Sequence, residues 1–205
     1  MAEIKLTKNE LRAQQNRLIL LLKYLPTLQL KKALLELEVG EARAEIAKAA
    51  GEYTAEKQIT DDFAAVLTDR LSFPIDAAVS ILEVKKRYEN IAGVEVPYLD
   101  AIEFRPFTYA LFDTPAWVDG ALNHLKKLAT GKITLEIAQA KKRALERELR
   151  EVSIRVNLFE KVLIPRAQAN IKKIKVFLGD QLLAAVSRAK VAKSKIEAEK
   201  AAHAH

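Results

Sequence analysis

The chain has 205 residues, of which 30% are charged and only 6% are aromatic, a composition that suits long helices better than a broad globular core. It contains no cysteine, which excludes disulfides, thiolate metal sites and cysteine nucleophiles. Its net charge of +7 favours an acidic protein surface or nucleic acid as partner. No apolar run approaches the roughly 20 residues that a membrane-spanning helix needs, and the first residues are too polar for a signal peptide. We therefore expect a soluble or peripheral cytoplasmic protein without direct membrane insertion.

The N-terminal segment predicts one long helix that begins at Thr7, where Thr7 and Glu10 form a capping-box pattern. We expect the helix to run to about Leu71. Pro26 removes one backbone hydrogen bond and predicts a bend, while Gly40 and Gly51 are either weak points or close-approach sites. The apolar stripe of this helix has members seven residues apart: Leu11, Leu18 and Leu25, then Leu21, Leu28, Leu35 and Ala42, extended by Val39 and Ile46.

The middle of the chain predicts a hairpin followed by a short helix. Residues 78–87 and 94–107 are rich in β-branched and aromatic residues and are strand candidates. Asn90, Gly93 and Pro97 are the predicted turn residues between them. Thr114 as N-cap and Pro115 at the first helical position open a short helix, and Gly131 is predicted to end it.

The C-terminal segment predicts a second long helix, because apolar residues return about every 3.6 residues from about Thr134 onward. Pro165 predicts a bend near Lys161 to Pro165. The alternative is two separate helices at each of the two prolines. The predicted seam consists of Leu149, Val152, Val156, Phe159, Leu163, Ala167, Ile171, Ile174, Leu178, Leu182, Ala185, Ala189, Ala192 and Ile196.

Two such stripes can bury each other, so the predicted fold is mainly α: a long antiparallel two-helix coiled-coil hairpin with a small central section that contains a β-hairpin and a short helix. The predicted sections are residues 1–76 for the N-terminal long helix, 77–131 for the central section and 132–205 for the C-terminal long helix. At roughly 1.5 Å per residue each long helix exceeds the width of a globule of this length. We therefore expect function to depend on length and stiffness.

No catalytic, cofactor-binding or metal site is predicted. Gly131 and Lys132 lack the earlier glycine and the following Ser or Thr of a phosphate loop. His124 has neither a cysteine nor a second internal histidine with which to share a metal, and no serine lies in a nucleophile elbow. The chain is therefore expected to be noncatalytic.

One charge cluster has a functional interpretation. Near the end of the last helix a partner protein can surround the chain, and we interpret the basic residues there as a contact surface, with simple solvation as the alternative. Nucleic-acid binding is weaker, because aromatic residues that stack on bases are absent from this stretch. The cluster consists of Arg188, Lys190, Lys193 and Lys195.

Three segments resemble one known family. Residues 155–166, RVNLFEKVLIPR, resemble the signature of the D subunit of V-type and archaeal-type rotary ATPases. Residues 90–97, NIAGVEVP, resemble the turn region of its central section. A looser match is the opening LTKNEL of residues 6–11 with Leu34 and Leu35 downstream. The tail at residues 181–190, QLLAAVSRAK, departs from the more acidic and aromatic tail of many relatives and looks closer to the bacterial branch.

The resemblance implies a central-stalk rotor shaft that couples ATP hydrolysis or synthesis in a catalytic hexamer to ion translocation through a membrane ring. The implied partners are the catalytic and nucleotide-binding subunits of the hexamer, the central-stalk F subunit and the C/d socket of the membrane ring. The implied location is cytoplasmic and peripheral to the membrane, with no cofactor and no nucleic acid. A freestanding coiled-coil adaptor and a basic nucleic-acid-binding helical protein are the alternatives.

Overall fold

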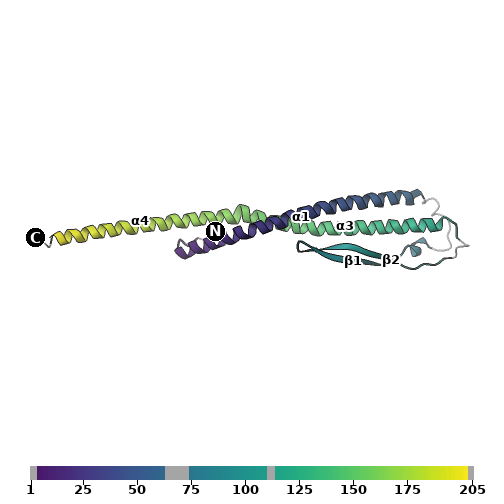
Figure 1. The fold of residues 1–205 in the computed structure, drawn as a ribbon, viewed down its shortest axis with the longest axis horizontal. Helices are drawn as coiled ribbons and strands as arrows, with labels where there is room; N and C mark the ends of the chain where they lie inside the picture. The colour runs from purple at the N-terminus through teal and green to yellow at the C-terminus, as the bar shows by residue number, and fades with distance from the viewer. Residues whose placement is uncertain (1–3, 63–73, 110–113, 203–205) are drawn as a thin grey trace. The chain divides into compact units, whose positions relative to one another are not determined.

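A computed structural model describes residues 4–62, 74–109 and 114–202 of the chain (Figure 1). The chain divides into two compact units, one formed by residues 31–152 and the other by residues 1–30 together with 153–205. Among the described residues, no helix has the length and apolarity needed to cross a bilayer. The elements in chain order are α1 (Lys8–Asp62), α2 (Ile75–Ala78), β1 (Ile81–Ile91), β2 (Val94–Phe104), α3 (Val118–Leu158), the π-helical turn η2 (Phe159–Leu163) and α4 (Ile164–Ala202).

The first helix begins where the capping pattern predicts. The backbone N–H of Glu10 donates to the Thr7 hydroxyl at 3.3 Å, and the N–H of Leu11 donates to the Thr7 carbonyl at 3.0 Å. The Glu10 carboxylate accepts a hydrogen bond from the Gln14 amide at 2.8 Å. Thr7 is therefore the N-cap of α1. The predicted end of this helix near Leu71 lies outside the described residues.

In the unit of residues 31–152, α1 and α3 pack side by side in opposite directions (Figure 1). Lys31 of α1 pairs with Glu148 of α3 at 2.6 Å, and the His124–Glu56 pair, also at 2.6 Å, joins the far end of α1 to the beginning of α3. The seam between the helices is apolar. It buries Leu35, Val39, Ala42 and Ala49 of α1 and Ile137, Ala138, Leu145 and Val152 of α3.

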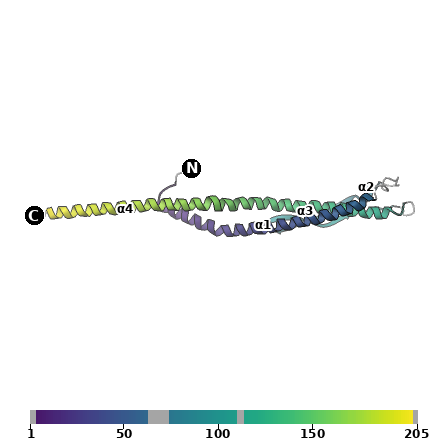
Figure 2. The same ribbon diagram turned by 90° about the horizontal axis from the view of Figure 1, so that it is seen from above.

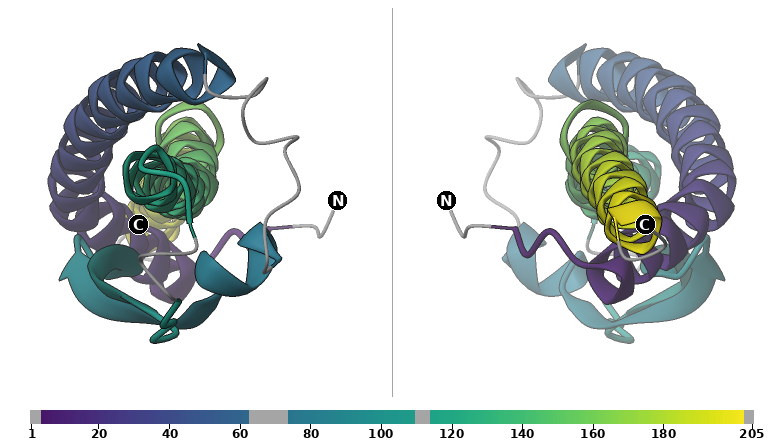
Figure 3. Two further views of the ribbon diagram at one scale, coloured as in Figure 1. Left: turned by 90° about the vertical axis from the view of Figure 1, so that its right-hand side faces the viewer. Right: turned by 90° about the vertical axis from the view of Figure 1, so that its left-hand side faces the viewer.

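Strands β1 and β2 form the predicted antiparallel hairpin, with Ile91 opposite Val94 across a two-residue turn. Ala92 and Gly93 occupy that turn with φ of 51° and 83°, the positive values that a tight hairpin turn requires. The Asn90 side chain supports it by accepting a hydrogen bond from the Gly93 N–H at 2.8 Å. Figure 3 shows that, within this unit, α3 lies between α1 and the hairpin.

Two predictions for the central section are wrong in detail. Pro97 is not a turn residue, because it lies inside β2 opposite Tyr88; a two-stranded sheet has free edges, where the missing N–H of proline is tolerated. The helix predicted to open at Thr114 and Pro115 begins at Val118 instead. A small core joins this start of α3 to α2. It contains Ala78, Val118 and Leu122, with Ile75, Val79, Phe107, Tyr109 and Trp117 packed against it.

Gly131 does not end a helix, contrary to prediction, because α3 runs through it from Val118 to Leu158. The short helix and the beginning of the predicted C-terminal helix are therefore one element. A Cβ placed on Gly131 would lie 3.6 Å from the Tyr53 ring of α1, so this glycine marks a position where a neighbouring aromatic residue packs close to the helix.

In the other unit, the beginning of α1 and the helix that follows Ser153 also run antiparallel. The Gln29 amide of α1 hydrogen-bonds the Glu160 carboxylate, and Gln14 and Ala167 line one groove between the two helices. The buried residues that face this pairing are Val156 at the end of α3 and Ile164, Ala167, Ile171 and Ile174 of α4. Figure 2 shows that α4 then extends past the first residues of α1.

Helical residues continue through both Pro26 and Pro165, which contradicts the alternative of two separate helices at each proline. The turn η2 comes directly before Pro165. A proline in a regular α-helix clashes with the carbonyl four residues earlier, here that of Lys161, and the wider π-helical turn provides room for the ring. Whether the helix axis bends at Pro26 and Pro165 remains a prediction.

Replacing Gly40 with Ala is expected to stabilise the protein by about 0.5–1 kcal/mol, because Ala reduces the conformational freedom of the unfolded chain and nothing lies within 4 Å of the added Cβ. Urea unfolding measures the difference. Gly93→Ala is the contrasting variant, because its φ of +83° is strained for any residue with a Cβ, and we expect it to destabilise. A loss of stability in Gly40→Ala would contradict the helical environment described for this position.

Candidate partner-binding surfaces

The predicted basic cluster lies on the last part of α4, and all four of its side chains are exposed. Arg188 and Lys195 lie on one face, where with Val191 they line a shallow hollow of about 390 Å³. Lys190 and Lys193 do not line this hollow, and Lys193 pairs within the helix with Glu197 at 3.8 Å. The structure therefore brings together only two of the four cations, around a patch of aliphatic surface.

The end of α4 also exposes the last part of the predicted apolar seam. The seam is buried as far as Ile174, whose side chain is 0% exposed, but Leu182 is 67% exposed. Among the described residues nothing covers this stretch. Large exposed apolar side chains on an uncovered helix favour association with another protein. The large residues that form it are Leu182, Leu183, Val186, Val191 and Ile196.

A lysine holds the hairpin against the helices in the unit of residues 31–152. Lys141 of α3 is only 7% exposed. Its Nζ lies 2.9 Å from a carboxylate oxygen of Glu45 in α1 and 4.3 Å from the centroid of the Tyr98 ring in β2. One buried cation therefore connects three elements through an ion pair and a cation–π contact.

Glu45 and Tyr98 stabilise the protonated, charged form of Lys141. Burial works to lower its pKa, but the interactions with Glu45 and Tyr98 outweigh burial, so the pKa is raised above the ordinary value of 10.5. A lysine whose pKa is higher in the folded state stabilises that state at neutral pH. Its contribution is lost only as the pH rises through the folded-state pKa.

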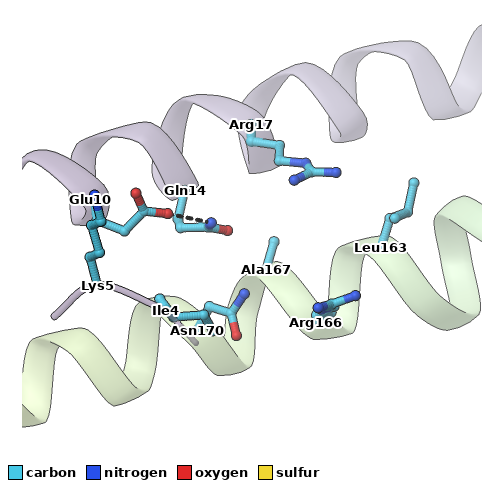
Figure 4. Close-up of a pocket in the computed structure, with 9 residues that line it drawn as sticks. All are labelled: Ile4, Lys5, Glu10, Gln14, Arg17, Leu163, Arg166, Ala167 and Asn170. Carbon is cyan, nitrogen blue, oxygen red and sulfur yellow. Dashed lines mark hydrogen bonds between the residues drawn. The ribbon is translucent and has the colours of Figure 1, made fainter. Parts of the chain in front are cut away.

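A groove opens between α1 and α4 in the unit that contains both termini (Figure 4). Its volume is about 410 Å³. Figure 4 shows Arg17 reaching from α1 toward α4, while Ala167 of α4 and Leu163 of η2 point toward α1. The small side chain of Ala167, which is buried, leaves the floor of the groove open. The remaining lining residues are Ile4, Lys5, Glu10, Gln14, Arg166 and Asn170.

The structure places His124 against Glu56, with 2.6 Å between Nδ1 and the carboxylate. In the part of the chain that the structure describes, no group of His, Cys, Asp and Glu residues is arranged to hold a metal ion. The His124 ring instead joins α3 to α1.

Sequence reasoning missed both Lys141 and the groove. Lys141 has a recognisable signal, because it shares the apolar face of its helix with Ile137, Ala138 and Leu145, and a charge on a buried face needs a partner. The groove has no comparable signal, since it depends on which side chains of two distant segments face each other. Pro26, Pro165, Asn90 and Gly93 do not meet at any of these surfaces.

Lys141→Met is expected to loosen the hairpin, because methionine fills similar space but forms neither the ion pair nor the cation–π contact. We expect a loss of about 2 kcal/mol, measured as faster amide hydrogen exchange in β1 and β2. Lys142→Met is the matched control, since it removes only an ion pair at 3.6 Å within one helix, worth about 0.5 kcal/mol or less. Equal exchange rates in the two variants would show that Lys141 does not hold the hairpin.

Comparison with known proteins gives one consistent result. The family model for the D subunit of ATP synthase matches residues 10–194. The V-type ATP synthase D subunit of Chlamydia muridarum (strain MoPn / Nigg) is 45% identical over 204 residues, which cover 97% of this chain and 98% of that protein. The protein of the same description from Chlamydia abortus (strain DSM 27085 / S26/3) is 43% identical, with 97% of this chain and 96% of the relative covered. That from Chlamydia pneumoniae is 42% identical with the same coverage.

Proposed function

This chain belongs to the family of ATP synthase D subunits, and from that premise we propose that it is the noncatalytic central-stalk rotor shaft of a V-type ATPase or ATP synthase. In this role it couples ATP hydrolysis or synthesis in a catalytic hexamer to ion translocation through a membrane ring. The protein then resides in the cytoplasm, peripheral to the membrane as part of the complex.

The observation that carries the proposal is the exposed end of α4. Residues 182–198 expose aliphatic side chains together with Arg188 and Lys195. An isolated helix of this length is marginal in water, and its apolar face gains stability when a partner covers it. The inner surface of a ring of subunits is a partner that can surround such a helix on all sides.

The paired seams supply the mechanical property that a shaft needs. In the unit of residues 31–152, α1 and α3 both bury apolar side chains in their seam, whereas in the other unit the apolar stripe of α1 is half-buried. The Lys31–Glu148 and Arg43–Glu146 ion pairs, at 2.6 and 3.0 Å, add polar contacts across the seam of residues 31–152. Twisting one helix past the other would expose the buried apolar side chains to water, at a cost of roughly 25 cal/mol per Å² of apolar surface. Bends at Pro26 and Pro165 would make the shaft asymmetric, so that it presents different faces to successive catalytic interfaces.

The remaining proposed partners are the central-stalk F subunit and the C/d socket of the membrane ring. The β-hairpin is a candidate surface for such a partner, because Leu82 and Tyr88 of β1 are exposed while Lys141 holds β2 in place through the Tyr98 ring. A role in binding nucleic acid has less support, because residues 182–198 contain no aromatic side chain on which bases would stack.

Neutralising the basic cluster tests the charge part of this proposal. We expect Arg188, Lys190, Lys193 and Lys195, all changed to Gln, to weaken assembly with the hexamer and to reduce its salt dependence, because attraction to acidic groups is lost. Each exposed pair contributes about 0–1 kcal/mol, so single changes should have little effect. The control changes the equally exposed Lys161, Lys172, Lys173 and Lys175 to Gln. An unaltered salt dependence in the first variant would refute the charge contact.

Removing residues 181–205 tests the apolar part. We expect the shortened chain to fold, because the buried seam ends at Ile174, yet to assemble with the hexamer at least about tenfold more weakly, since several large aliphatic side chains no longer contribute. Co-purification of tagged full-length and shortened chains with the other ATPase subunits measures this. The shaft proposal fails if the full chain retains no ATPase subunit, or if the shortened chain retains them as well and supports the same coupled activity.

A further inference from the structure

The groove between α1 and α4 is lined by three cations and one carboxylate, unlike the ion-paired seam between α1 and α3. Across the seam of residues 31–152, cations face carboxylates: Lys31 faces Glu148, and Lys141 faces Glu45. In the groove of Figure 4, by contrast, Arg17 projects from α1 and Arg166 lies on α4. Lys5 also lines this groove.

The groove has little negative charge of its own to balance these cations. Its single described carboxylate, that of Glu10, already accepts the Gln14 amide at 2.8 Å. In the described part of the chain, the side chains of Lys5, Arg17 and Arg166 form no ion pair. The three cations are exposed, so solvent and salt screen part of their mutual repulsion, and an anion between them would neutralise the rest.

The lining residues match the chemistry of an oxyanion. A guanidinium group presents paired N–H donors that fit the oxygens of phosphate, and the half-buried Asn170 adds an amide donor. The volume of about 410 Å³ lies in the range of small-molecule sites, roughly 300–1,000 Å³. The aliphatic Leu163 and the small Ala167 lie beside these polar groups in Figure 4.

We propose that this groove is a binding site for a tetrahedral oxyanion of the phosphate class, held between Arg17 of α1 and Arg166 of α4 with Lys5 and Asn170 at its edge. The anion neutralises the facing cations and links the two helices, so that it stabilises the pairing of α1 with α4. Inorganic phosphate and the phosphate chain of a nucleotide share this chemistry. The site is independent of the shaft function, which does not require it.

The test titrates the full chain with inorganic phosphate, pyrophosphate and ATP in separate experiments at fixed ionic strength. Binding is followed by calorimetry and by the NMR signals of the arginine Nε–H groups. We expect saturable binding that shifts the signals of Arg17 and Arg166. Binding of phosphate and pyrophosphate identifies the free anion as the source, whereas binding of ATP alone identifies a nucleotide.

Variants separate a site from diffuse attraction. Arg17→Gln and Arg166→Gln should each weaken binding about tenfold or more, the loss expected for a charge-assisted hydrogen bond. Asn170→Asp, which keeps the side-chain shape but adds a negative charge, should weaken it further. Arg12→Gln and Lys172→Gln are the matched controls, because these exposed cations lie on the same two helices but do not line the groove. The proposal is overturned if no anion binds saturably, or if the controls weaken binding as much as the groove variants.

Discussion

The helical part of this structure depends on the apolar contact between paired antiparallel helices, α1 with α3 in one unit and α1 with α4 in the other. Leu35 and Ala42 of α1, Leu145 of α3 and Ile174 of α4 are completely buried. Their burial is possible only because the partner helix runs alongside. Polar contacts lie at the edges of the seam, where the Lys31–Glu148 ion pair helps to set the register of α1 against α3. The hairpin is a further layer, held through Lys141 to both helices.

The apolar contact between the helices also explains why the end of α4 is a candidate binding surface for a partner. Up to Ile174 the helix buries its apolar face, and from Leu182 onward it continues with the same kind of face but exposes it. Alanine, lysine and glutamate in this stretch favour helix on their own, so the helix persists without a neighbour while its aliphatic face stays open. A helix of this kind is suited to enclosure by partner subunits, which is the role proposed above for a member of this family.

The large features were predictable because they depend on local patterns. Thr7 and Glu10 identify the start of α1, the turn at Gly93 identifies the hairpin, and the spacing of leucines identifies the face that α1 buries. The errors arose where a distant neighbour overrides a local preference. Gly131 was predicted to end a helix, but it lies in the interior of α3 beside Tyr53, and Lys141 was not singled out although Glu45 and Tyr98 allow it to be buried. The groove at Arg17 and Arg166 depends on how α1 and α4 face each other, which no local pattern contains.

The central claim is that α1 runs antiparallel to α3 in one unit and to the segment formed by η2 and α4 in the other. Spin-label distances test this claim most directly. The chain has no cysteine, so Gln29→Cys with Glu160→Cys in one unit, and Lys31→Cys with Glu148→Cys in the other, can be labelled without background. Pulsed electron paramagnetic resonance on each doubly labelled chain should give one short, narrow distance distribution, because the native side chains at these positions touch. Long or broad distributions for both pairs would show that the helices do not pair in this register.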